Sequence, residues 1–171
     1  MPGGSQLALD SVRLLAEGRA LLERLDDAVF VATPAVQLGA VGSHFRHCFD
    51  FYLCFLAGLE RGSVDYEARE REARIEGDRW RAMQVAGELE TRLAAVGVEV
   101  EGHELAVASG TGTGGNGGHR STVGRELQFL ASHTLHHYAL IAALLRLQGV
   151  EPGQEFGVAA GTLEHRRVSA Q

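Results

Sequence analysis

Four stretches of the chain carry apolar residues at intervals of three and four, the spacing that gathers side chains on one face of an α-helix. Ser5 precedes the first stretch as a candidate N-cap, and Gly62 follows the second, where glycine readily takes a left-handed, helix-ending conformation. The expected helices cover residues 6–25, 40–60, 68–96 and about 121–148. This pattern predicts an all-α fold, a four-helix bundle that forms a single domain over residues 1–171.

The segments between and after these helices predict little regular structure. We expect residues 26–39 to form a connector. Apolar and polar residues alternate over 98–101 as in a short strand, which is expected to pair with 104–108 as a small hairpin. A C-terminal extension follows at 150–171, and we expect its apolar patch at 156–159 to pack back on the bundle.

The most biased stretch of the sequence is a glycine-rich segment at 110–118. Its Gly110, Gly112 and Gly115 formally match the dinucleotide-binding pattern of spaced glycines. That pattern needs a βαβ unit and an acidic residue about 20 positions further on. Neither is evident here, and the sequence has too few expected strands for such a sheet. We therefore interpret 110–118 as a flexible loop.

Two histidines lie on the apolar face of the last expected helix. The face consists of Leu130, His133, His137, Leu140 and Leu144, at steps of three and four. Since a buried polar group without a partner costs ~1–3 kcal/mol, two adjacent buried imidazoles are well satisfied by sharing one cation. Thr134 stands where zinc metalloproteases of the His-Glu-x-x-His type have their glutamate, so that class is excluded.

A third histidine, His47, lies on the apolar face of the second expected helix with Phe51 and Cys54. Together with His133 and His137 it predicts a three-histidine site between two helices. Three neutral imidazoles leave a coordination position open, as catalytic sites require, and a cation there can activate water, polarise an oxygen or bind a thiolate. The alternative is a set of core histidines satisfied by carbonyls or water.

Neighbouring polar residues give candidate catalytic groups and open questions. Asp50 can orient a ligand histidine or accept a proton near bound water, or it forms a helix-surface salt bridge with Arg46. Tyr138 can donate its hydroxyl into the site, or pack its ring in the core. His44 is either solvent-facing or pocket-lining, and His136 is either a surface group or a group that contacts a ligand histidine.

The composition and charge of the chain limit the classes of partner that it is expected to bind. The formal net charge is −6, and the sequence has no basic stripe, which argues against nucleic acid. No apolar run approaches the ~18–20 residues of a membrane span. Cys48 and Cys54 would lie ~9 Å apart along one helix, too far to pair, and two free thiols favour a reducing cytoplasm.

Four segments carry a family resemblance: residues 41–50 with the motif His44-x-x-His47, residues 125–127, residues 132–141 with His133-x-x-x-His137, and residues 156–159. Together they resemble the DinB/YfiT-like metalloenzymes. The resemblance spans about residues 5–165. It implies an up-down-down-up four-helix bundle with a long crossover before the last helix, and a metal held by His47, His133 and His137. It also implies a homodimer, with thiol-dependent S-transferases and the helical domain of sulfoxide synthases as relatives.

Three hypotheses of function follow. The first is a metal-dependent enzyme with an open three-histidine site for a divalent metal, with zinc first and then nickel or iron. It would act on a small molecule by hydrolysis or by transfer of a low-molecular-weight thiol. The second is a non-catalytic, metal- or small-ligand-binding stress-response bundle. The third is a metal-free helical interaction protein with core histidines.

Overall fold

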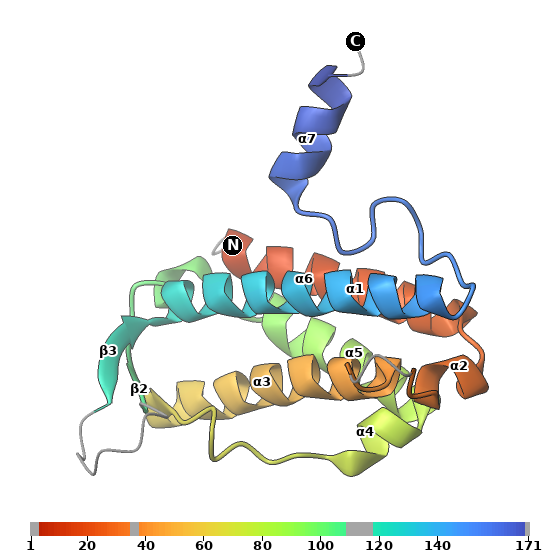
Figure 1. Ribbon diagram of the computed structural model, residues 1–171. Coiled ribbons are helices and arrows are strands. Elements are labelled where there is room, and N and C mark those ends of the chain that lie inside the picture. The colour runs from red at the N-terminus through yellow and green to blue at the C-terminus, as the bar shows by residue number, and fades with distance from the viewer. Residues whose placement is uncertain (1–3, 35–37, 109–117, 170–171) are drawn as a thin grey trace.

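The computed structural model describes residues 4–34, 38–108 and 118–169, most of which are helical (Figure 1). A 3-10 turn lies at Val98–Val100. The helices are α1 (Gln6–Arg24), α2 (Asp27–Val31), α3 (Val41–Arg61), α4 (Ala73–Gly77), α5 (Arg79–Ala94), α6 (Val123–Leu147) and α7 (Ala160–Ser169). The strands are β1 (Ser63–Val64), β2 (Glu104–Val107) and β3 (His119–Thr122).

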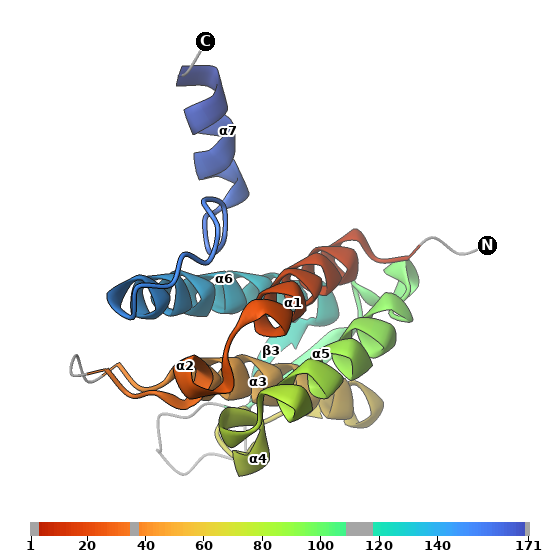
Figure 2. The same cartoon turned by 90° about the vertical axis from the view of Figure 1, so that its right-hand side faces the viewer.

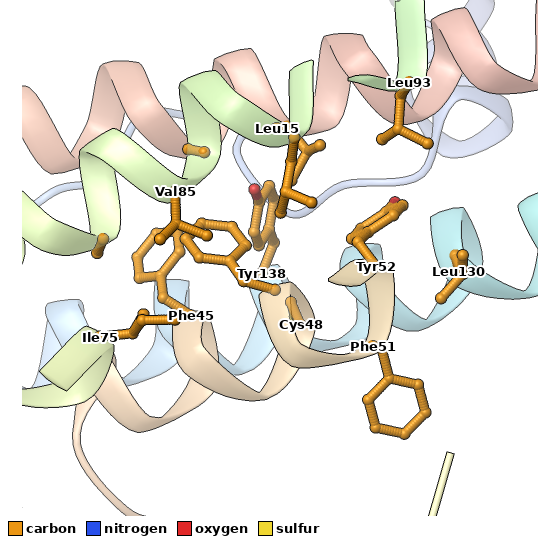
Figure 3. Packing of buried hydrophobic residues seen from close by; sticks show 14 of the residues in the cluster. Leu15, Phe45, Cys48, Phe51, Tyr52, Ile75, Val85, Leu93, Leu130 and Tyr138 are labelled. Atoms are coloured by element: carbon orange, nitrogen blue, oxygen red, sulfur yellow. The ribbon is translucent and has the colours of Figure 1, made fainter. Parts of the chain in front are cut away.

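Four long helices share one hydrophobic core. Helix α1 packs against α5 and α6, and α3 packs against α5 and α6 (Figures 1 and 2). Large fully buried side chains, among them Phe45, Tyr52 and Tyr138, fill the space between these helices (Figure 3). The up-down-down-up connectivity of a four-helix bundle stays a prediction. None of the helices that the structure describes is long and apolar enough to cross a lipid bilayer.

Helix ends follow local hydrogen bonding. The Ser5 hydroxyl accepts from the backbone N–H of Ala8 at 3.0 Å and caps α1. Gly62 adopts a φ of 69° and ends α3, as its position predicts. Thr122 caps α6 by accepting from the backbone N–H of Arg125 at 3.2 Å. The expected limits of the first, second and fourth helices therefore agree with α1, α3 and α6.

The single helix expected over 68–96 is wrong. Residues 67–72 are not helical, and the rest divides into α4 and α5 at Asp78. The Asp78 carboxylate accepts from the backbone N–H of Arg81 at 3.1 Å, so it starts a new helix as an N-cap. The expected connector 26–39 also contains the short helix α2.

A small three-stranded sheet corrects the all-α expectation. Strand β2 pairs antiparallel with β3 and parallel with β1, in the order β1-β2-β3. Its predicted hairpin partner, 98–101, instead forms the 3-10 turn, in which the N–H groups of Val100 and Glu101 bond back to Gly97 and Val98. The sheet lies at one end of α3 and α6 (Figure 1).

The two remaining expectations concern the glycine-rich loop and the C-terminal extension. Residues 109–117 lie outside the described part of the chain, so the loop prediction stays a prediction. In the extension, Phe156 is buried, and its ring stacks on Tyr138 with centroids 4.7 Å apart. The expected packing is confirmed for Phe156, whereas Ala159 at the end of the patch is exposed. Helix α7 beyond it has no buried residue and projects away from the other helices (Figure 1).

Candidate metal centre

Helices α3 and α6 bring the three predicted histidines together. His47 comes from α3, and His133 and His137 come from successive turns of α6. Each offers one ring nitrogen such that all three nitrogens lie within 4.8 Å of one another, and the Nε2 atoms of His47 and His133 are 2.9 Å apart. Two nitrogens bound tetrahedrally to zinc at ~2.0–2.1 Å lie ~3.3 Å apart, so the cluster has the dimensions of a metal site.

The environment keeps these imidazoles neutral. Burial, together with the neighbouring histidines, lowers the pKa of His137 to about 3 and that of His47 to about 4. The pKa of His133 is lowered as well, chiefly by burial. A neutral imidazole has one nitrogen lone pair free, and that is the form that binds metals. The donor set fits a divalent transition metal, and it does not select among zinc, nickel and iron.

An aromatic wall lies against one side of the cluster. The ring centroid of Phe51 is 4.7 Å from that of His133, and Phe129 stacks on His133 at 5.6 Å. Tyr66 in turn stacks on Phe51 at 5.0 Å. Figure 3 shows Phe51 turned away from the other labelled core side chains, and its ring forms part of this wall. The wall limits the access of water to His133 from that side.

Arg69 is a site residue that the sequence pattern did not indicate. Its guanidinium lies over the Phe51 ring, 4.5 Å from the centroid, and Nη2 is 3.4 Å from Nδ1 of His47. Nη1 donates to the carbonyl of Tyr66 at 2.6 Å. The contact brings a positive charge next to His47 and contributes to its lowered pKa. Residue 69 belongs to the segment expected to be helical, where its side chain had no predicted partner.

His44 is buried, and both of its ring nitrogens have partners. Nδ1 is 2.8 Å from Nδ1 of His137, and Nε2 is 2.8 Å from the carbonyl oxygen of Leu38. Burial lowers the pKa of His44. Of the two interpretations left open by the sequence, the solvent-facing one is therefore wrong, since this histidine contacts a ligand candidate directly. His136 is exposed, with its ring edge-on to His137 at 5.5 Å.

Asp50 is buried beside Arg46. Its Oδ2 accepts from Nη1 of Arg46 at 2.9 Å, and Nε of Arg46 donates to Glu76 at 2.6 Å. Burial raises the pKa of Asp50, and Arg46 partly opposes that shift. These contacts match the salt-bridge interpretation, and a catalytic role for Asp50 stays a prediction.

Tyr138 lies in the core. It follows His137 directly, so its side chain leaves α6 ~100° further round the helix. Its hydroxyl donates to the carbonyl of Leu14 in α1 at 2.8 Å, and its ring lies among the core side chains (Figure 3). This placement matches the packing interpretation, and the predicted donation into the site has no support from it.

A pocket of about 610 Å³ opens beside the aromatic wall. Tyr66 and Phe129 belong both to the wall and to the pocket lining. At its edge Glu126 is buried, and its carboxylate accepts from the Tyr66 hydroxyl at 2.8 Å and the Ser121 hydroxyl at 2.6 Å. Arg125 also lines the pocket. The pocket is large enough for a small molecule.

Comparison with known proteins places this arrangement in a family. The family model of the DinB superfamily matches residues 12–141, and the chain belongs to that superfamily. The crystal structure of YjoA, a DinB-like protein from Bacillus subtilis, matches with a TM-score of 0.63, covering 85% of this chain and 92% of that chain at 15% identity. That likeness shows a shared fold. No curated protein matches the sequence. The resemblance predicted from the histidine motifs is confirmed.

Proposed function

We propose that the protein is a metal-dependent enzyme that acts on a small molecule, by hydrolysis or by transfer of a low-molecular-weight thiol. The observation that carries the proposal is the convergence of His47, His133 and His137 within 4.8 Å, from two helices that are fixed by a large core. Three neutral nitrogen donors leave at least one coordination position for a reacting group, which distinguishes a catalytic from a structural site.

The residues of the chain have separate roles in this proposal. The three histidines hold the cation, which, when bound, supplies Lewis-acid chemistry to a water, a substrate oxygen or a thiol. Phe51 and Phe129 exclude water from one side of the histidines. Arg69 places a positive charge beside His47, where it can attract an anionic group of the substrate.

The pocket beside the wall is the proposed place for the rest of the substrate. It adjoins the candidate centre, because Phe129 both lines the pocket and stacks on His133. Because Glu126 is already hydrogen-bonded by Tyr66 and Ser121, the basic group of Arg125 is the more available charge. A small molecule with an anionic group and an apolar part fits this lining.

Further details of the proposal rest on chemistry and family resemblance. We place zinc first among the metals, then nickel and iron, since imidazole suits all three. The free cysteines Cys48 and Cys54 favour a reducing cytoplasm. A homodimer follows from family resemblance alone.

The test is the metal content of untagged protein, measured by elemental mass spectrometry. We expect about one metal ion per chain in the wild type, as a single three-histidine site requires. His47→Ala, His133→Ala and His137→Ala should each lose it. His136→Ala is the matched control, because this exposed histidine neighbours His137 on the same helix and should keep the metal. Metal-free wild type, even after exposure to each candidate cation, would refute the proposal.

Loaded protein is then screened for hydrolysis of esters and amides and for conjugation of thiols to electrophiles. Turnover that chelation abolishes and metal restores is the expected result. Stoichiometric metal without turnover, combined with a large fall in melting temperature on chelation, would instead favour the non-catalytic bundle.

A further inference from the structure

His44 links the candidate metal centre to the start of helix α3. It lies in the first turn of α3, three residues before His47, and is buried against α6. Its two ring nitrogens contact two different groups, the Leu38 carbonyl oxygen and Nδ1 of His137, each at 2.8 Å. The identity of these partners determines where the protons are.

The contact with the Leu38 carbonyl determines which ring nitrogen of His44 carries its hydrogen. A carbonyl oxygen only accepts hydrogen bonds, so Nε2 of His44 must carry the hydrogen in this contact. Buried and neutral, the imidazole holds one proton, so its Nδ1 has a lone pair and can only accept. Two nitrogens with facing lone pairs would repel at 2.8 Å, so Nδ1 of His137 must be the donor.

The proton on Nδ1 of His137 leaves its Nε2 with a free lone pair. We propose that His44 is a positioning residue that selects this tautomer of His137 and holds its ring for metal binding. The proposal rests on the function proposed above, because it treats His137 as a ligand. Partners of this kind orient a ligand histidine and raise its basicity through the nitrogen that does not bind the metal.

The backbone before α3 anchors this chain of hydrogen bonds. Gly39, directly after Leu38, has a φ of 82°, a conformation that other residues rarely adopt. A Cβ at Gly39 would lie 2.8 Å from the Ser43 hydroxyl oxygen, which itself donates to the carbonyl of Ala40 at 2.7 Å. The turn that presents the Leu38 carbonyl to His44 is therefore held by contacts inside the first turn of α3.

Two substitutions separate hydrogen bonding from packing. His44→Leu fills a similar volume but neither donates nor accepts, so Nδ1 of His137 loses its acceptor. In His44→Gln the amide can accept from His137 through Oε1 and donate to Leu38 through Nε2, which reproduces both contacts. His136→Ala again serves as the control, since it removes an exposed imidazole next to His137. Thermal melting of each variant reports whether it folds.

The first readout is the tautomer of His137 in metal-free protein, from NMR of ¹⁵N-labelled histidine. We expect the hydrogen on Nδ1 in the wild type, in His44→Gln and in His136→Ala, and a mixture of tautomers in His44→Leu. The second readout is the zinc dissociation constant, by competition with a chromophoric chelator. We expect His44→Leu to weaken zinc binding by ~10–100-fold, the usual effect of losing such a partner. His44→Gln should restore most of that loss.

Two results would overturn the proposal. A hydrogen on Nε2 of His137 in the wild type would show that His44 does not select the metal-binding tautomer. Unchanged zinc affinity in a folded His44→Leu variant would show that the contact does not support the ligand. Wild-type protein that binds no cation would refute the proposed function separately, and the tautomer measurement on the metal-free protein would still decide the role of His44.

Discussion

Gly18 gives a sharp test of how α1, α3 and α6 pack. It is buried in the middle of α1, where a Cβ would collide with the Tyr138 hydroxyl oxygen. The same Cβ would lie 2.8 Å from Cζ of Tyr138, closer than real Cβ contacts, and 3.0 Å from Cε1 of Phe45, tighter than most of them. The Tyr138 ring cannot move aside freely, because its hydroxyl donates to Leu14 and its ring stacks on Phe156.

The change in the free energy of unfolding caused by Gly18→Ala is the sum of opposing effects. Alanine in a helix interior gains ~0.5–1 kcal/mol over glycine. Overpacking the core costs ~1–3 kcal/mol, and losing the hydrogen bond from Tyr138 to Leu14 costs ~0.5–1.5 kcal/mol more. We therefore expect the free energy of unfolding to fall by about 0.5–4 kcal/mol. For a chain of this size that lowers the melting temperature by roughly 1–16 °C.

Gly87 is the matched control. It lies within α5, and a Cβ there would meet nothing within 4 Å. Gly87→Ala should therefore show the helix propensity alone, with a gain of ~0.5–1 kcal/mol. Both variants are compared with wild type by thermal melting and by urea titration at one pH. If the two substitutions shift stability in the same direction, the packing argument at Gly18 is wrong.

Two further predictions concern buried ionisable groups. Arg46→Ala leaves the buried Asp50 carboxylate without its cation and should cost about 3–5 kcal/mol at neutral pH, whereas removing the exposed Arg13 should change little. Burial raises the pKa of the Asp50 carboxyl, and Arg46 opposes this rise. The stability cost of removing Arg46 should therefore shrink as the pH falls through that raised pKa and the carboxyl becomes neutral. Urea titrations in which this cost stays constant down to acidic pH would contradict the prediction. Burial also raises the pKa of the Cys48 thiol, so a thiol-specific chromogenic reagent should label the half-buried Cys54 in folded protein and Cys48 only on unfolding; equal labelling rates in folded protein would refute that order.

The sequence allowed the long helices to be predicted because their periodicity results from burial on one face. The same logic found the histidines: His133 and His137 occupy positions on an apolar face, so they had to point toward another helix. Placing His47 required only that α3 be the other helix. These predictions depend on spacing within one element, which the sequence contains directly.

Features that depend on contacts between distant segments could not be predicted. Strand β3 reads His-Arg-Ser-Thr, without apolar alternation, and it meets β2 only after an intervening glycine-rich segment. Tyr138 and Asp50 were assigned to the site from proximity in sequence, yet a rotation of ~100° or a salt bridge decides where each side chain lies. His44 and Arg69 acquire roles only through partners on other segments.

The position of the candidate centre bears on how metal binding and folding are related. Helices α3 and α6 each have a face in the core, with Phe45 and Tyr138 among their largest buried residues, and the three histidines lie on the neighbouring faces. The core can hold both helices in place without a cation, in contrast to small zinc domains that unfold when the metal is removed. The ligands are then largely preorganised, so the metal would stabilise the fold only through its binding equilibrium. A core that folds without the cation predicts that chelated protein keeps its helices, whereas a bundle that needs the metal for its structure would lose them.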